Sequence, residues 1–128
     1  MESLVICDTN VLIAAYKNNE EVVGQLRSIG QTNMSISAVT ASELIYGALN
    51  KLDLKRILQD INHLPLFEID RSISRVHLAL MQKYALSHKL SLADALIAAT
   101  ALINKLPIYT LNLKDFRYIE GLTLYHPS

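Results

Sequence analysis

The segment Ser3-Leu4-Val5-Ile6-Cys7-Asp8-Thr9-Asn10 decides the fold of this chain, because a short apolar run ends there in three polar residues. A run of this length, rich in Val and Ile and bounded by Asp and Asn, predicts a buried β-strand over 3–7. Helical patterns follow over 10–17 and 20–29, and the second ends at Gly30. A strand that leads directly into a helix is typical of an alternating β/α pattern.

The rest of the chain repeats this alternation. Further strands are predicted over 34–37, 66–69, 108–110 and 122–125, and further helices over 38–48, 52–63, 71–87 and 92–106. Asp70 is expected to cap the helix 71–87. The helix 92–106 is apolar nearly all round, so it belongs at the centre of a domain. Short apolar strands that alternate with helices predict a three-layer α/β/α sandwich around a mainly parallel sheet of four to five short strands.

Length and composition limit the class of protein. The chain has 128 residues, 51% of them hydrophobic, and its 12 Lys and Arg balance 12 Asp and Glu. This predicts one folded domain over 1–128 and excludes a disordered or histone-like chain. The apolar runs are far shorter than the ~20 residues of a membrane span, and no secretory signal is visible. One cysteine cannot form an internal disulfide, so we expect a cytoplasmic protein that does not enter the membrane.

Four acidic residues follow or flank the predicted strands. Asp8 comes directly after the first strand, and Asp115 comes shortly after the strand 108–110. Glu43 lies in the first turns of the helix after the second strand, and Asp94 lies in the first turn of the buried helix. Because parallel strands share one carboxyl edge, the four carboxylates could converge on one cleft there.

Each acid also has a purely structural interpretation, which the sequence leaves open. Asp8 can cap the helix behind it, Thr40 to Glu43 and Ser91 to Asp94 match capping boxes, and Asp115 is typical of a solvated loop acid. Several carboxylates in apolar surroundings are costly, however, because they lose hydration and repel one another. A bound divalent cation neutralises such a cluster. Carboxylate ligands suit Mg²⁺ or Mn²⁺, whereas Zn²⁺ prefers Cys or His.

Four blocks of sequence carry a resemblance to a known family. They are Val5–Asn10 (VICDTN), Ser42–Gly47 (SELIYG), Leu92–Ala99 (LADALIAA) and Thr110–Phe116 (TLNLKDF). In their order and spacing, over essentially the whole chain, they resemble the PIN-domain ribonucleases and, more narrowly, the VapC-type toxins of toxin–antitoxin operons. The C-terminal residues 125–128 lack the tryptophan that some members of the family carry.

The resemblance implies endonucleolytic cleavage of RNA that depends on Mg²⁺ or Mn²⁺. It also implies a VapB-like antitoxin that obstructs the cleft, and a toxin homodimer. The implied acidic quartet is Asp8, Glu43, Asp94 and Asp115. We expect Asp8 and Asp94 to bind the metal directly, and the other two acids to act through waters or a second metal. The polar positions that would steady the quartet are Thr9, Asn10 and Asn112.

Two other classes of function compete with this interpretation. A catalytically silent PIN-like scaffold, which binds RNA or protein without cutting, is expected to lack one or more acids of the quartet, and all four are present. A phosphoacceptor receiver domain needs a second acid adjacent to the first, and Asp8 has no acidic neighbour.

Other side chains leave their roles open. Three basic sets are either solvated faces or phosphate contacts beside the cleft: Lys51, Lys55 and Arg56; Arg71 and Arg75; Lys114 and Arg117. No histidine has metal-ligand spacing, and His77 is predicted in the core or an interface. Cys7 is predicted to be a buried strand residue with no base to activate it. Tyr16 and Tyr46 either line the mouth of the cleft or pack at its rim.

Overall fold

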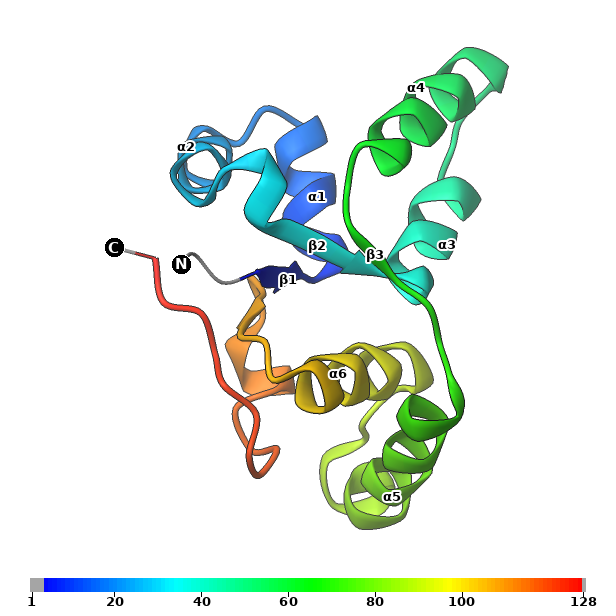
Figure 1. Ribbon diagram of the computed structural model, residues 1–128, viewed down its shortest axis with the longest axis vertical. Helices are drawn as coiled ribbons and strands as arrows, with labels where there is room; N and C mark the ends of the chain where they lie inside the picture. The colour runs from blue at the N-terminus through cyan, green and yellow to red at the C-terminus, as the bar shows by residue number, and fades with distance from the viewer. Residues whose placement is uncertain (1–3, 128) are drawn as a thin grey trace.

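Strands and helices alternate along the chain in the computed structural model, which describes residues 4–127 (Figure 1). The elements in order are β1 (Val5–Cys7), α1 (Thr9–Tyr16), α2 (Glu20–Ile29), β2 (Met34–Ser37), α3 (Ala38–Tyr46), α4 (Lys51–Asn62), β3 (Leu66–Phe67), α5 (Arg71–His88), α6 (Leu92–Asn104) and β4 (Ile108–Tyr109). Two short 3₁₀ helices, η1 (Gln31–Asn33) and η2 (Leu113–Asp115), precede β2 and follow β4. The predicted α/β class is therefore confirmed.

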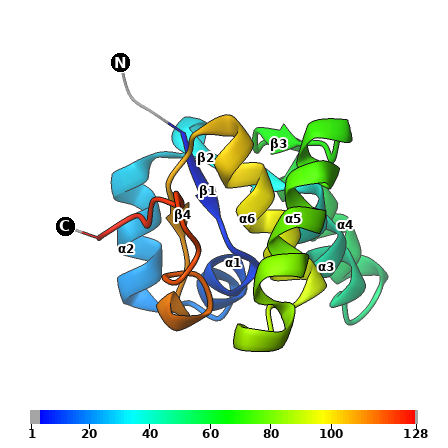
Figure 2. The same ribbon diagram turned by 90° about the horizontal axis from the view of Figure 1, so that it is seen from below.

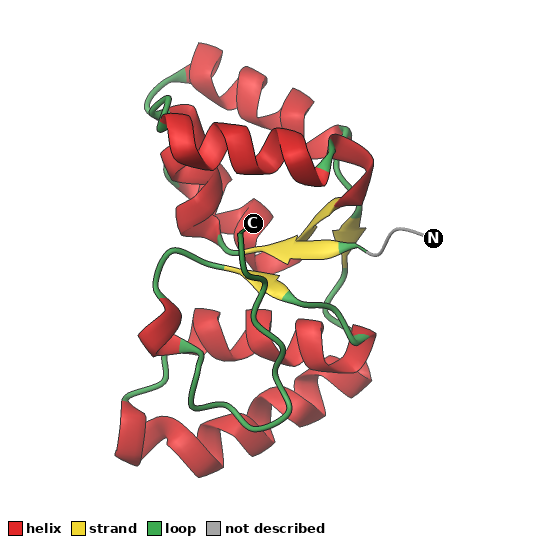
Figure 3. Cartoon of the chain, turned by 90° about the vertical axis from the view of Figure 1, so that its left-hand side faces the viewer, coloured by secondary structure: helices red, strands yellow, loops and turns green. Residues whose placement is uncertain are grey.

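The four strands form one parallel sheet in the order β3-β2-β1-β4. Val5 pairs with Met34, Ile6 with Ile108 and Ile36 with Leu66. Since all the strands run in one direction, their carboxyl ends share one edge, opposite the side from which the N-terminus enters β1 (Figure 3). The two central strands, β1 and β2, are buried along their whole length, as parallel strands covered on both faces are.

Helices cover both faces of the sheet. Helices α5 and α6 lie on one face, and α1 to α4 lie on the other (Figures 1 and 2). Neighbouring residues of β1 point to opposite faces, so Ile6 packs with α5 and α6 while Cys7 packs with the other layer. The expected central helix is α6, in which Ile97, Ala98 and Ala99 have no exposed surface. The predicted three-layer sandwich is thus present.

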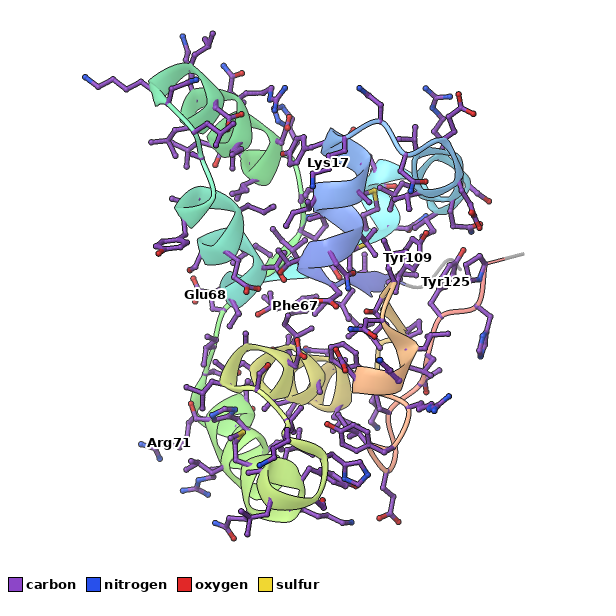
Figure 4. All side chains as sticks on the ribbon, turned by 180° about the vertical axis from the view of Figure 1, so that it is seen from behind. Lys17, Phe67, Glu68, Arg71, Tyr109 and Tyr125 are labelled. Carbon is purple, nitrogen blue, oxygen red and sulfur yellow. The ribbon has the colours of Figure 1, made fainter. Side chains whose placement is uncertain are left out.

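Several helices and strands are shorter in the structure than the sequence predicts. The strand 122–125 is reduced to a single parallel bridge between Ile108 and Leu124, although the ring of Tyr125 still packs on Tyr109 at the edge of the sheet (Figure 4). The strand 66–69 shortens to β3, which pairs with β2 alone. The helix 92–106 ends at Asn104, because Lys105 adopts a left-handed conformation.

The other boundaries differ from prediction by a residue or two. Helix 38–48 ends at Tyr46, and Asp70 caps α5 as expected. Ser3 of the first predicted strand lies outside the described residues, as do the ends of the expected domain 1–128. Within residues 4–127, no helix combines the length and the hydropathy that crossing a membrane requires.

Candidate active site

Asp8 is fixed at the junction of β1 and α1. Its carboxylate is only 5% exposed and accepts two hydrogen bonds. Oδ1 accepts from the backbone N of Thr9 at 2.8 Å, which caps α1, and Oδ2 accepts from the hydroxyl of Thr110 at 2.8 Å. The predicted capping role of Asp8 is therefore real. It is compatible with a place in the cleft, because a carboxylate has about four lone-pair positions.

Glu43 is held by a pair of buried hydroxyl groups. Its Oε1 accepts a hydrogen bond of 2.6 Å from Oγ1 of Thr9, and Oγ1 of Thr40 lies 3.1 Å from the same Thr9 oxygen. A hydroxyl has one proton, so when Thr9 donates to Glu43, Thr40 donates to Thr9. Ser37, and not Thr40, caps α3, so the capping box read at Thr40 and Glu43 is wrong. The exposed glutamate is thereby aimed at the start of α1.

Asp94 occupies the first turn of α6, beneath the cap that Ser91 provides. The Oγ of Ser91 accepts from the backbone N of Asp94 at 3.1 Å, as the capping interpretation predicts. Burial, followed by the charges of Asp8 and Asp115 and then by that of Glu43, raises the pKa of Asp94 to about 6, against the lowering effect of a hydrogen bond with Ser91. The half-buried carboxylate therefore lies within electrostatic reach of the other three acids.

Asp115 ends η2, and amide side chains organise the turn that leads to it. Nδ2 of Asn112 donates to Oδ2 of Asp115. The backbone N of Asn112 donates to the hydroxyl of Thr110 at 3.1 Å, and Oδ1 of Asn10 accepts from the backbone N of Leu111 at 3.2 Å. The two asparagines therefore tie the segment after β4 to the start of α1.

Mutual repulsion marks the four acids as one cluster. The pKa of Asp8 is raised first by burial, is lowered again by the hydrogen bonds from Thr110 and Thr9, and is raised by the charges of Glu43 and Asp115. Four elements from both layers thus deliver carboxylates to the same carboxyl edge of the sheet. The structure brings together all four of the acids singled out in the sequence, and the three polar residues expected beside them contact them or their neighbours.

The donor set, made of carboxylates, fits Mg²⁺ or Mn²⁺ better than Zn²⁺, which prefers Cys or His. Across residues 4–127, no group of three His, Cys, Asp or Glu side chains is arranged to hold a metal ion directly. Mg²⁺ does not need such a cage, because it keeps several waters and binds through one or two carboxylates. Asp8 and Asp94 are buried or half-buried, lie in mutual repulsion and would gain from a positive charge between them. The residues present therefore fit Mg²⁺ or Mn²⁺.

Two threonines belong to the site but were not predicted from the sequence as site residues. Thr110 donates to Asp8 across 102 positions, and Thr40 supports Thr9 across 31 positions. Both are buried. A signal for each was available: Thr110 ends a predicted strand two residues before Asn112, and Thr40 lies one helical turn before Glu43.

The other side chains singled out in the sequence lie outside the acidic cluster. Cys7 is fully buried, and burial, with a smaller effect of the Asp8 charge, raises the pKa of its thiol to about 12. Tyr16 donates to Asp60 at 2.7 Å and has Arg56 over its ring, so it joins α1 to α4. Tyr46 is 93% exposed. His77 is half-buried, and within the described residues its Nδ1 has no hydrogen-bond partner.

Comparison with known proteins finds a matching family, relatives in sequence and similar solved structures. The PIN domain family model matches residues 5–122. The chain is 32% identical over 123 residues to Ribonuclease VapC10 of Mycobacterium tuberculosis, with 93% of this chain and 90% of the relative covered. It is 30% identical over 124 residues to the tRNA(fMet)-specific endonuclease VapC of Salmonella typhimurium, with 91% and 92% covered. A toxin–antitoxin complex from Klebsiella pneumoniae superposes with a TM-score of 0.81 at 31% identity, over 97% of this chain and 98% of its own.

Proposed function

The chain belongs to the PIN-domain family and, within it, to the VapC ribonucleases, and from that membership we propose its function. We propose that it is an endoribonuclease that depends on Mg²⁺ or Mn²⁺. In this proposal it acts as the toxin of a toxin–antitoxin pair. One observation carries the proposal. Four carboxylates from four elements meet at the carboxyl edge of the sheet, where burial, together with the charges of neighbouring acids, raises the pKa of Asp8 and of Asp94. The order and spacing of the four blocks, and the names of both curated relatives, support the same reaction.

Each acid of the site would have its own role in hydrolysis. Asp8 and Asp94 would hold the metal, and Glu43 and Asp115 would contact it through waters or a second ion. When bound, the cation supplies a Lewis acid that promotes ionisation of water and neutralises charge on the phosphoryl oxygens. Glu43, aimed by the hydroxyl of Thr9, would orient the attacking water and accept its proton. A bond would form from the water oxygen to phosphorus as the bond to the leaving ribose oxygen breaks, and that oxygen would take up a proton from solvent.

Cleavage assays test the metal and the site together. We expect the purified chain to cut RNA internally in millimolar Mg²⁺ or Mn²⁺ and to be silent in excess EDTA. Because one relative is named for tRNA(fMet), total tRNA that includes tRNA(fMet) belongs in the substrate panel. Asp8→Asn should reduce cleavage at least about a hundredfold, while Glu20→Gln, an exposed acid on α2, should not. Cleavage that survives chelation would exclude the metal mechanism.

Partners and location form the second part of the proposal. A VapB-like antitoxin would cover the acidic cleft, in keeping with the toxin–antitoxin complex of similar fold, and the toxin would act in the cytoplasm as a homodimer. Expression should then arrest growth, and co-expression of a small DNA-binding protein encoded directly upstream should relieve the arrest. Light scattering of the purified chain reports its oligomeric state. A silent scaffold would instead bind RNA and leave it intact.

A further inference from the structure

The rings of His88 and Tyr118 form a stack that packs on Tyr84 at the C-terminal end of α5, outside the acidic cluster. The ring centroids of His88 and Tyr118 are 3.9 Å apart, and the two planes differ by only 9°, so the rings lie face to face. Tyr84 meets both edge-on, at 5.6 Å from His88 and 5.0 Å from Tyr118. Burial decreases along the series: Tyr84 is buried, Tyr118 is half-buried and His88 is exposed. The outermost ring of the stack is therefore an imidazole that solvent reaches.

Polar contacts around the stack join the segment after η2 to α5. The hydroxyl of Tyr84 accepts from the backbone N of Glu120 at 3.2 Å, and the Glu120 carboxylate pairs with Lys83 at 2.9 Å. The Oγ of Ser87 also lies 2.7 Å from Nδ1 of His88. The rings are therefore oriented in the protein before any ligand arrives, which lowers the entropic cost of using them for binding.

The stack lies close to the acidic cluster. Tyr118 follows η2, which ends with Asp115, and His88 precedes Ser91, the cap of the helix that carries Asp94. After burial, the charges of Asp115 and Asp94 are what raise the pKa of the Tyr118 phenol. The Tyr118 ring thus lies within electrostatic reach of two of the four carboxylates.

We propose that His88 and Tyr118 form a stacking platform for an unpaired nucleobase next to the phosphodiester bond bound at the acidic cluster. Proteins hold single-stranded RNA in this way, by stacking its splayed bases on exposed aromatic faces. The inference rests on the proposed RNA cleavage and adds to it a stacking contact, at His88 and Tyr118, with a base beside the bond that is cut. His88 contacts a base and positions the strand, whereas the acids act at the phosphate.

An equilibrium experiment isolates stacking from chemistry. The full chain carrying Asp8→Asn binds a roughly 12-nucleotide fluorescent single-stranded RNA and, in parallel, a strand of the same length with abasic spacers in place of the bases. The preference is the ratio of the two affinities. We expect His88→Ala to reduce this preference at least about fivefold, with the affinity for the abasic strand unchanged. His88→Phe, which keeps a flat ring, and His63→Ala, an exposed histidine of the other layer, should keep the preference within about twofold.

Each outcome decides the question. A preference that survives His88→Ala, a parent protein with no preference for bases, or a His88→Phe variant as weak as His88→Ala would overturn the platform. Thermal melting of every variant separates misfolding from lost stacking. RNA cleavage by the wild-type chain in Mg²⁺ is scored separately. Cleavage without a base preference refutes the platform alone, whereas a base preference without cleavage refutes the nuclease and retains the platform as an RNA-binding surface.

Discussion

At the scale of single residues, the hydroxyl of Thr9 connects the buried Thr40 with Glu43, the residue proposed to orient the attacking water. It donates to Glu43 and lies beside the fully buried hydroxyl of Thr40. We predict that Thr9→Val, which has nearly the same volume, lowers kcat of RNA cleavage about 10- to 100-fold, because Glu43 loses its orientation. Thr9→Ser should retain most of the activity. Kinetics and melting curves check this, and a fully active valine variant would show that Glu43 is positioned without Thr9.

Asp94 predicts a pH dependence of stability in the metal-free protein. Its folded-state pKa of about 6 lies above the ~3.9 of an unfolded chain. As pH falls through 6, the folded state binds a proton that the unfolded state does not, so this group makes the folded state more stable. Melting in EDTA should therefore shift upward between pH 7 and pH 5. Asp94→Asn should melt at or above wild type at pH 7 and lose part of the upward shift, since the pKa of Asp8 is raised as well.

Asp94 also predicts how added metal changes the stability of the folded protein. Mg²⁺ should stabilise wild type, as any ligand specific for the folded state does, and Asp94→Asn should lose most of that gain. Ser91→Ala is the matched control, because it removes the cap of α6 at a cost of about 1 kcal/mol and should leave the metal-induced shift intact. If Asp94→Asn behaves like Ser91→Ala, then Asp94 has only a structural role.

At the scale of elements, the end of α6 can be improved. Lys105 follows this helix with φ 55°, a left-handed conformation that glycine adopts without strain. We predict that Lys105→Gly raises the free energy of unfolding by about 0.5–1 kcal/mol. Lys55→Gly, in the interior of α4, should lower it by about 1 kcal/mol. Chemical denaturation of both variants measures the two signs, and a destabilising Lys105→Gly would contradict the account.

Elements with a strong local signal were predictable, and those that depend on a neighbour were not. Helix α2 begins and ends as predicted, because Asn19 and Gly30 mark its ends within the sequence itself. The pattern of 122–125 favoured a strand, but only Leu124 forms a bridge, since pairing depends on how the tail meets β4. The alternation of apolar runs fixes the layers, whereas the length of an edge strand depends on tertiary contacts.

The same division holds in the candidate site. The acids were predictable because carboxylates in apolar segments are unusual and because the blocks containing them have a recognisable order. Thr40 and Thr110 were missed, since threonine is common and each acts only through a partner far along the chain. The His88–Tyr118 stack was equally invisible, because nothing in either local sequence indicates the other ring.

At the scale of the whole molecule, a net charge of zero conceals a separation of charge. Setting aside the four acids of the cleft leaves eight acidic residues against twelve basic ones. Lys114 and Arg117 flank Asp115 and are exposed, so they are available to RNA phosphates. We predict that RNA binding by the Asp8→Asn chain weakens with salt, and that replacing both residues by Ala makes the log–log slope shallower by about 0.7 to 1.4. Lys51 and Lys55, on α4 in the other layer, serve as the control pair (Figure 1).

The pairing of β1 with β4 gives the site an order of assembly in time. Asp8 is the first of the four acids to be synthesised, yet the hydroxyl that fixes its carboxylate belongs to Thr110, 102 positions later, and Asp115 comes later still. At translation rates of about 5–20 residues per second, the first acid waits several seconds for the last. A nascent chain therefore carries an incomplete site until Asp115 has been made. A nuclease built in this order cannot assemble its acidic cluster while any of the four acids is still to be synthesised.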